Sequence, residues 1–470
     1  MDLFTLVVGI LCLSLASNAE ETFENSTNLC EKCKCINGPQ FVLDCQKQDF
    51  HHMIANWPEH NVALIATFSY NNISNVEILP DSDLVTKVIL SHCGIKSVDN
   101  GAFKTVKYLT YLDLSYNLLT TEEISPEIFK GTYNNTVYEP LMLEDLDLSH
   151  NEIHSLPHNI FEHLTTLKQL NLAGNNLRVL DPPTQMALSG LTNLQVLNIA
   201  DNDLTDLVED AVRNLQKLRI LNLTMNLLDF VPDTLSLLSN SLEAVYLDHN
   251  LIFEITDESF LGVKGIKVLS LTNLPRLQYV NANSFAHLQN LSILYLSDNP
   301  SLTTIDRDAF GKGQVLEELY LHSNSLQDLH YNLTNWSALR LFTLKDNSLF
   351  CDCDLYEISQ ALSSEIKMDK DGPFCINPIT DVSMMIYNLT EEACSFDVSF
   401  QQYTYRASHL MDSHFHTIKL VFIILLVIAT LIAFVALAIA LLRCYRFRIN
   451  QNYPFPTQVM YNPLRTQNIN

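Results

Sequence analysis

One phrase recurs along most of this 470-residue chain. It reads Leu-x-x-Leu-x-Leu-x-x-Asn-x-Leu, returns about every 24 residues, and occurs twelve times within residues 63–349. A clear copy runs from Leu109 to Leu119. A fixed period of this length predicts a solenoid, in which each repeat packs only against its neighbours. Such an array offers one long surface and no ready active-site cleft, so the repeats favour binding over catalysis.

Each phrase alternates leucines with other residues, which predicts a short strand with its leucines toward a core. Stacked repeats align these strands into one parallel sheet, and the longer connecting stretches form an outer arc. Phenylalanines recur at one place in that arc, and we interpret them as a packing spine: Phe103, Phe129, Phe161, Phe260, Phe285 and Phe310. The predicted fold class is therefore an α/β-type repeat solenoid, a horseshoe with a parallel sheet on its concave face.

An Asn follows the strand in most repeats. Its side chain is expected to point inward and satisfy buried backbone groups, so we interpret this column as structural. Two repeats depart from it, at Cys93 and Leu274. We interpret Cys93 as a free, buried and unreactive thiol, and we expect a local irregularity at Leu274. The step from Asn117 to Asn151 is 34 residues, which predicts an insertion around 132–140 that bulges out as a loop.

Most of the eleven cysteines mark the two ends of the array. Four precede the first repeat and four follow the last: Cys30, Cys33, Cys35, Cys45, Cys351, Cys353, Cys375 and Cys394. A solenoid needs end caps because its apolar core is otherwise open, and disulfides hold small caps together in an oxidising compartment. A zinc site built from the four N-terminal cysteines is the alternative, which secretion disfavours. The sequence alone leaves three pairings open in each cap.

These motifs together resemble the extracellular leucine-rich-repeat family over roughly residues 28–395, including the ectodomains of Toll-like receptors and leucine-rich-repeat adhesion proteins. The Cys-x-x-Cys-x-Cys cluster that ends at Cys45 resembles the family's N-terminal cap, and the cysteines from Cys351 onward resemble its C-terminal cap. The resemblance implies that the first cysteine of each cap pairs with the third, and the second with the fourth. The implied pairs are Cys30–Cys35, Cys33–Cys45, Cys351–Cys375 and Cys353–Cys394.

Two apolar segments predict where the chain lies. Residues 1–19 are typical of a secretory signal peptide. Residues 420–442 contain no charge and would span about 34 Å as a helix, enough to cross a bilayer. Arg443, Arg446 and Arg448 follow, which predicts a cytoplasmic tail and an extracellular N-terminus at the plasma membrane. The other predicted segments are the N-terminal cap (20–62), the repeats (63–349), the C-terminal cap (350–395), a stalk (396–419) and the tail (443–470).

The formal net charge is −25, and the predicted tail is basic, so the extracellular part is still more acidic. This charge argues against nucleic acid as a ligand and permits a basic protein partner, although solubility alone explains it equally well. The sequence contains no phosphate loop, no His-Glu-x-x-His and no Gly-x-Ser-x-Gly. We therefore expect no enzymatic activity, no cofactor, no metal and no small-molecule substrate.

Binding specificity is expected on the outward positions of the strands. Those of the N-terminal third include Tyr111, Asp113, Asp145 and Asp147. Those farther along are mostly aliphatic or aromatic: Val196, Asn198, Ile220, Tyr246, Val268, Ile293, Tyr295, Tyr320 and Leu341. Exposed apolar patches and tyrosines favour a protein interface, while strand propensity alone is the competing explanation. The predicted partner-binding residues are Tyr246, Val268, Ile293, Tyr295, Tyr320 and Leu341.

Asn-x-Ser/Thr sequons predict glycosylation at eight positions. They are Asn25, Asn72, Asn134, Asn222, Asn290, Asn332, Asn335 and Asn388. Asn222 occupies an outward strand position, where a glycan would interrupt the concave face near its middle. We therefore expect a partner to bind to one side of it, over repeats eight to twelve. The alternative is that Asn222 is unmodified.

The leading hypothesis is a single-pass cell-surface protein that binds an extracellular or cell-surface protein, in cell adhesion or as the ligand-binding part of a receptor complex. Because the predicted tail has only 28 residues, a membrane co-receptor or homo-oligomer would transmit any signal. The alternative is an accessory subunit of a channel or transporter that acts through its membrane helix; shedding of the ectodomain is a third. Cys444 is a lipidation candidate, and Tyr461 with Leu464 is a sorting-signal candidate.

Overall fold

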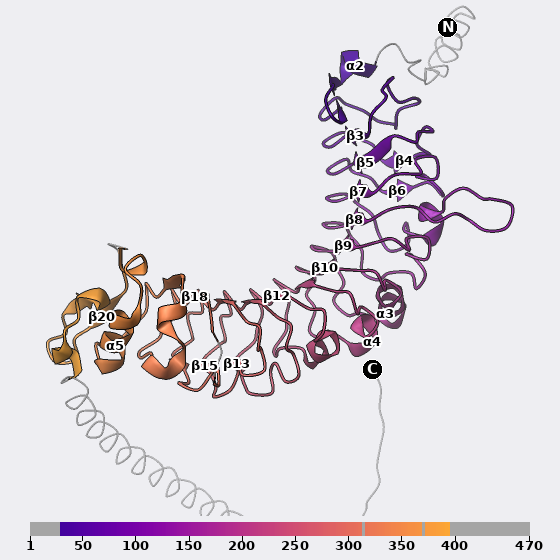
Figure 1. The fold of residues 1–470 in the computed structure, drawn as a ribbon. Coiled ribbons are helices and arrows are strands. Elements are labelled where there is room, and N and C mark those ends of the chain that lie inside the picture. Colours follow the sequence, from indigo (N-terminus) through magenta and orange to yellow (C-terminus); the bar gives the residue numbers. More distant parts are fainter. Residues whose placement is uncertain (1–28, 313–314, 369–371, 395–470) are drawn as a thin grey trace, which may run out of the picture. The chain divides into compact units, whose positions relative to one another are not determined.

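A computed structural model describes residues 29–312, 315–368 and 372–394 (Figure 1). The predicted signal peptide, stalk, membrane segment and tail lie outside the described residues, as do Asn25, Cys444, Tyr461 and Leu464. Within the described ranges, no helix combines the length and the apolar character that a bilayer span requires.

A fourteen-stranded sheet runs through the described part of the chain, and its strand order follows the sequence. Twelve of these strands are the predicted repeat strands, which pair in parallel, and they confirm the predicted solenoid with its sheet on the inner side of the bend (Figure 1). They are β3 (Leu64–Thr67), β5 (Val85–Ile89), β7 (Tyr111–Asp113), β8 (Asp145–Asp147), β9 (Gln169–Asn171), β10 (Val196–Asn198), β11 (Ile220–Asn222), β12 (Ala244–Tyr246), β14 (Val268–Ser270), β16 (Ile293–Tyr295), β18 (Glu318–Tyr320) and β19 (Leu341–Thr343).

The sheet begins inside the N-terminal cap, which the sequence did not reveal. The cap holds α2 (Leu29–Lys32), β1 (Lys34–Ile36) and β2 (Phe41–Asp44). β1 and β2 form an antiparallel pair, and β2 then pairs in parallel with β3. The backbone hydrogen bonds of the first repeat strand are therefore continued by the cap.

Shorter elements form the outer side of the bend (Figure 1). The strands there are β4 (Asn75–Val76), β6 (Ser97–Val98), β13 (Glu254–Ile255), β15 (Tyr279–Val280) and β17 (Thr304–Ile305). The helices are α3 (Pro182–Ser189) and α4 (Glu209–Val212), with 3-10 turns η1 (Pro126–Phe129), η2 (Asp233–Leu238), η3 (Tyr331–Leu333) and η4 (Trp336–Ala338). Asp181 begins α3 by accepting a hydrogen bond from the Thr184 backbone N–H, and Pro182 suits the first turn.

The six phenylalanines of the predicted spine are all buried in the outer arc. Phe285 packs against both Phe260 and Phe310, with ring centroids 6.0 and 5.1 Å apart. The interpretation of these residues as packing groups is confirmed.

The asparagine column is structural, as predicted. Asn117 donates to the carbonyls of Leu90 and Leu114 at 2.9 Å each, and it accepts from the N–H groups of Cys93 and Ile95 at 2.9 and 3.1 Å. One side chain thus pairs buried groups of two successive repeats. The free thiol of Cys93 is buried in this column, donates to the Phe68 carbonyl at 3.1 Å, and has its pKa raised by burial.

The prediction of a local irregularity at Leu274 was wrong for the strand register. The register passes from β12 through β14 to β16 without a shift. The Leu274 side chain is fully buried, and its N–H still donates to Asn299 Oδ1 at 2.7 Å. An apolar side chain therefore fills the interior position without a shift in strand register, and Asn299 satisfies the Leu274 N–H.

The predicted insertion does project as a loop from the outer side (Figure 1). Tyr133 and Tyr138 form an antiparallel bridge across it. At its base, the Glu139 N–H donates to the Thr132 carbonyl at 2.9 Å. The sequon residue Asn134 is exposed in this loop.

Disulfides hold both caps. The bonded pairs are Cys30–Cys35, Cys33–Cys45, Cys351–Cys375 and Cys353–Cys394, which are the pairs that the resemblance implies. Zinc ligation by the four N-terminal cysteines is excluded, because their sulfur atoms are bonded to one another. The C-terminal cap contains α5 (Cys353–Ala361), η5 (Ile366–Met368), β20 (Phe374–Ile376), β21 (Ser383–Met385), η6 (Ile386–Asn388) and η7 (Glu391–Ala393).

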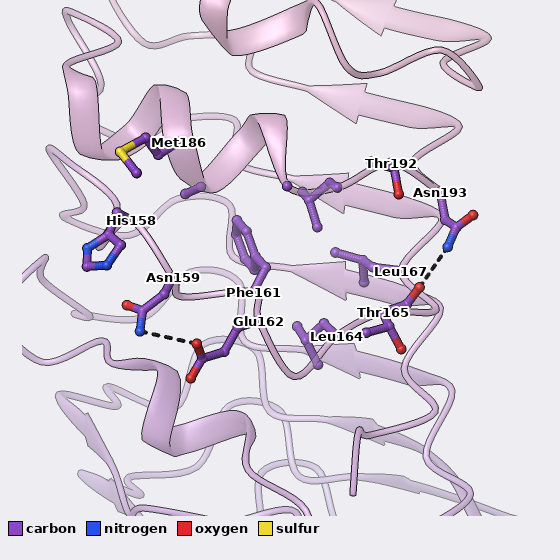
Figure 2. A pocket seen from close by; sticks show the side chains of 13 residues that line it. His158, Asn159, Phe161, Glu162, Leu164, Thr165, Leu167, Met186, Thr192 and Asn193 are labelled. Atoms are coloured by element: carbon purple, nitrogen blue, oxygen red, sulfur yellow. Dashed lines mark hydrogen bonds between the residues drawn. The ribbon is translucent and has the colours of Figure 1, made fainter. Parts of the chain in front are cut away.

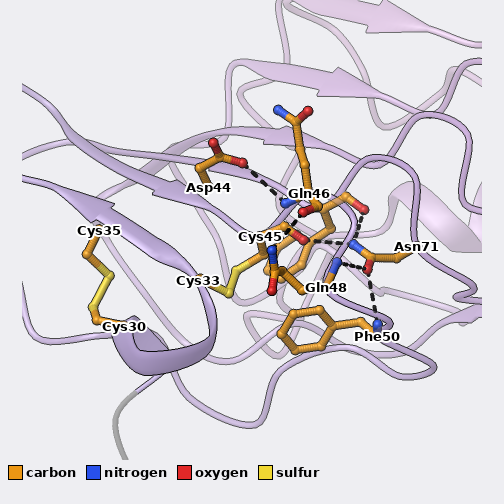
Figure 3. Close-up of a disulfide and its surroundings, with 10 residues drawn as sticks. Cys30, Cys33, Cys35, Asp44, Cys45, Gln46, Gln48, Phe50 and Asn71 are labelled. Carbon is orange, nitrogen blue, oxygen red and sulfur yellow. Dashed lines mark hydrogen bonds between the residues drawn. A yellow bond between two sulfur atoms is a disulfide. The ribbon is translucent and has the colours of Figure 1, made fainter.

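Asn71 joins the N-terminal cap to the first repeat (Figure 3). Its amide donates to the Cys45 carbonyl at 2.9 Å and accepts from the N–H groups of Gln48 and Phe50 at 3.0 Å each. The first asparagine of the column therefore pairs backbone groups of the cap, just as the later asparagines pair backbone groups of neighbouring repeats.

Candidate protein-binding face

The predicted outward residues all lie in strands of the large sheet, on the side opposite its buried leucines. Most are half-buried, and Ile220 and Leu341 are exposed. The register places Tyr111 beside Asp145, and Tyr295 beside Tyr320. The face is therefore continuous, but its two halves differ in chemistry.

We call the outward residues of β12, β14, β16, β18 and β19 the C-terminal face. The rings of Tyr295 and Tyr320 stack there, with centroids 4.5 Å apart and planes inclined by 19°. The Tyr320 hydroxyl donates to Glu318 Oε2 at 2.9 Å. Burial is the main cause that raises the pKa of Tyr320, and this hydrogen bond is the next. Val268 and Ile293 are neighbours in the register beside this pair. The result is an aromatic and aliphatic surface with fixed ring orientations.

Charged side chains on this half are paired. Glu243 lies between Arg219 and Lys267, at 2.9 and 3.1 Å. Hydrogen bonds from Arg219 and then from Lys267 lower the pKa of Glu243 to about 2. Glu318, which holds the tyrosine pair, also accepts from Arg340 at 3.1 Å.

Asn222 divides the face. It lies in β11, between Asn198 and Tyr246 in the register. Its side chain is half-buried, and Oδ1 accepts from the Thr224 N–H at 3.0 Å. The other described sequon residues are exposed and lie outside the strands of the large sheet: Asn72, Asn134, Asn290, Asn332, Asn335 and Asn388. Glycosylation of any of them stays a prediction.

We call the outward residues of β5, β7, β8 and β9 the N-terminal face. Asp147 accepts from Ser149 and, at 2.9 Å, from Asn171. Asp113 accepts from the Ser115 N–H at 2.8 Å. Burial raises the pKa of both Asp113 and Asp145.

A stack of rings along this face was not predicted. Tyr70, His92, Tyr116 and His150, which we call the aromatic column, stand immediately before the asparagine position of the first four repeats. Their centroids are 4.5, 4.3 and 4.1 Å apart. The N–H of each residue donates to a carbonyl of the next repeat, so the backbone fixes the spacing of the rings.

Both ends of the aromatic column are defined. Lys47 holds the equivalent position in the cap, and its ammonium lies 5.1 Å from the centre of the Tyr70 ring. Gly174 follows His150, and a Cβ on Gly174 would lie 2.2 Å from His150 Nδ1. The sequence does contain a signal, because Tyr and His alternate before the asparagine position of the first four repeats. Only the three-dimensional structure shows that these rings stack.

A pocket of about 310 Å³ lies away from this face, between α3 and the turns before β9 (Figure 2). Phe161, Leu164 and Leu167 contribute apolar surface to it. At its edge Asn159 donates to Glu162 at 3.4 Å. None of the predicted site residues lines it, and no group of three or more His, Cys, Asp or Glu suited to a metal ion occurs in the described parts of the chain.

Known proteins with similar sequences or folds are repeat proteins as well. A leucine rich repeat family model matches residues 83–132, 142–194, 240–300 and 289–349. Podocan-like protein 1 of Mus musculus is 30% identical over 186 residues, covering 39% of this chain and 30% of that protein. Lumican of Gallus gallus is 29% identical over 202 residues, covering 43% and 53%. The chain thus spans about half or less of the relatives that it matches. A solved leucine-rich-repeat protein of Leptospira interrogans is 22% identical, with a TM-score of 0.49 over 63% of this chain and 69% of that one.

Proposed function

We propose that this chain, a capped repeat solenoid similar to leucine-rich-repeat proteins, binds an extracellular protein partner through its C-terminal face. The observation that carries the proposal is the stacked pair of Tyr295 and Tyr320. Tyrosines are frequent anchors of protein interfaces, since they bury a large area with few rotatable bonds. Here Glu318 already orients one of them.

Neighbouring side chains support the same role. Val268 and Ile293 add aliphatic surface beside the pair, and Leu341 is 38% exposed. The charged groups nearby are paired within the chain, so a partner need not leave them uncompensated when it excludes water. The strands hold these side chains before binding, which keeps the ordering cost low.

We further propose that residues 420–442 anchor the protein at the cell surface with the repeats outside. This rests on the uncharged length of the segment and on the arginines that follow it. Adhesion, or ligand binding within a receptor complex, fits a protein that presents a rigid binding face next to a membrane.

Cells that express the full chain should capture a partner from a panel of labelled extracellular proteins. The double variant Tyr295→Ala/Tyr320→Ala should then weaken that binding by roughly 30-fold, as expected for the loss of an interface anchor. Tyr108→Ala is the matched control, because Tyr108 is exposed but lies outside the strands of the sheet.

Replacing residues 420–442 by an unrelated membrane span should leave capture unchanged. Capture that survives the tyrosine variant but not the replaced span would overturn this proposal and favour a role through the membrane segment.

A further inference from the structure

The N-terminal face lies on the other side of Asn222 from the proposed partner site, and it has a different chemistry. We propose that this face, together with the aromatic column, binds a positively charged segment of a protein. This goes beyond the proposed function, because it assigns a second contact zone and does not depend on the C-terminal face.

The tyrosines of this region already hold cations of the chain itself. Lys47 Nζ lies 5.1 Å from the centre of the Tyr70 ring, and Lys87 Nζ lies 5.3 Å from that of Tyr111. Both distances fall within the range of cation–π attraction, about 6 Å. The surface is thus suited to ammonium or guanidinium groups. Tyr70 and Tyr116 are also 50% and 47% exposed, which leaves ring surface for a ligand.

Carboxylates lie beside these rings. Asp113 and Asp147 are neighbours in the register, and Asp145 stands beside Tyr111. Adjacent strands of a sheet are about 4.8 Å apart, so these groups form a row across β7 and β8 rather than one convergent cage. A row of acceptors fits successive basic side chains of an extended segment better than it fits a single ion.

One carboxylate oxygen of Asp145, Oδ1, is buried and lacks a hydrogen-bond partner among the described residues. Burial is the largest cause that raises the pKa of Asp145, and the charge of Glu144 adds to it, while the charges of Lys87 and Lys168 act in the opposite direction. A cation bound at this face would give the buried oxygen the partner that it lacks.

The fold does not require these charges. The corresponding positions in the next repeat are Gln169 and Asn171, and the strand there keeps the same register. Asp113 and Asp147 accept backbone N–H groups just as the neutral Asn171 does, so the sheet uses their oxygens but not their charge. Acids with perturbed pKa values are frequent at functional sites. The outward positions of β5 to β9 also contain no sequon, so no predicted glycan covers them.

The test uses the purified full-length protein in detergent micelles and fluorescein-labelled octa-lysine, followed by fluorescence anisotropy at fixed ionic strength. Octa-lysine should bind and octa-glutamate should not. The double variant Asp113→Ser/Asp145→Asn should weaken binding about tenfold, because it removes two charges from the proposed contact zone. Neither substitution creates a sequon.

The matched control is Asp201→Asn/Asp298→Asn, which removes the same charge from residues outside the N-terminal face. It should change the affinity by less than about twofold, since exposed charges at a distance are screened. Tyr116→Leu should weaken binding about threefold, whereas Tyr116→Phe keeps the ring and should leave it unchanged.

Failure of wild-type protein to bind octa-lysine, or equal weakening by both acid pairs, would overturn the inference, because the charge would then act only as a diffuse field. Circular dichroism excludes unfolding as a cause of lost binding. The Tyr295→Ala/Tyr320→Ala variant should still bind octa-lysine. The proposals for the two faces can therefore be refuted independently.

Discussion

Selected carboxylates on the two halves of this one sheet have opposite environments. On the C-terminal half, Glu243 is clamped between Arg219 and Lys267, and its pKa falls to about 2. On the N-terminal half, burial raises the pKa of Asp113 and Asp145. The backbone is the same in both regions, so the difference lies in the side chains that each repeat places outward.

This contrast separates what the repeats need from what a ligand needs. A carboxylate that is paired within the chain contributes to the stability of the array. One that is buried without full compensation costs stability. The acids of the C-terminal face are thus paired within the chain, and the basic segment proposed above would pair those of the N-terminal face.

The largest expected effect is the loss of stability when a buried asparagine is removed from either half, and it tests whether both halves have the same kind of interior. Asn117→Ala and Asn324→Ala should each lower the free energy of unfolding by roughly 3 kcal/mol, because each leaves several buried backbone groups unpaired. Asn324 donates to Leu296 and Leu321 at 2.8 Å and accepts from Asn299 at 2.9 Å, much as Asn117 does. Urea unfolding followed by circular dichroism measures both variants. A large loss from one and almost none from the other would show that the halves differ beneath the surface as well.

A smaller effect of opposite sign is expected from Asp145→Asn. A raised pKa means that the charged form is disfavoured in the folded state, so the wild-type residue costs stability at pH 7. The variant should gain roughly 0.5 kcal/mol there. The gain should disappear as the pH falls through the raised pKa to below about 3.5, where the aspartate is protonated in both states. Thermal unfolding at pH 7 and at low pH measures this; a loss of stability at pH 7 would contradict the account of the N-terminal face.

The smallest effect is expected from Glu243→Gln. Because the pKa of Glu243 is lowered, its charge stabilises the folded state above about pH 4.5, and this contribution is lost as the pH falls toward 2. The side chain is 33% exposed, so solvent screening limits the loss at pH 7 to about 0.5 kcal/mol. The same thermal scans should show wild type and variant converging near pH 2. A variant more stable than wild type at pH 7 would remove the contrast between the halves.

The sequence predicted the parts of the fold that depend on repetition. Regular leucines located the twelve repeat strands, and the shared position of Asn117 and its equivalents predicted their inward role. The expectation at Leu274 failed because a buried leucine fits the interior without a register shift, and the Leu274 N–H is satisfied by the next asparagine, Asn299.

The candidate site was only half predictable. Outward residues such as Tyr295 and Tyr320 follow from strand alternation, but their stacking and the bond to Glu318 require coordinates. The aromatic column was not predicted, because its members lie 22 to 34 residues apart in the sequence and outside the strands. Likewise, burial of Asp145 depends on its surroundings and cannot be read from its position alone.

The central claim is that a protein partner binds the concave sheet rather than the outer arc, and added glycans test it most directly. Tyr295→Asn creates an Asn-Leu-Ser sequon on β16, and Asp257→Asn creates an Asn-Glu-Ser sequon after β13 on the outer side. Both variants are expressed on cells, and a shift in mass confirms that the glycan is attached. Partner capture should be lost with the glycan at position 295 and kept with the one at position 257. Capture that persists with the first glycan, or is lost with the second, would contradict the account.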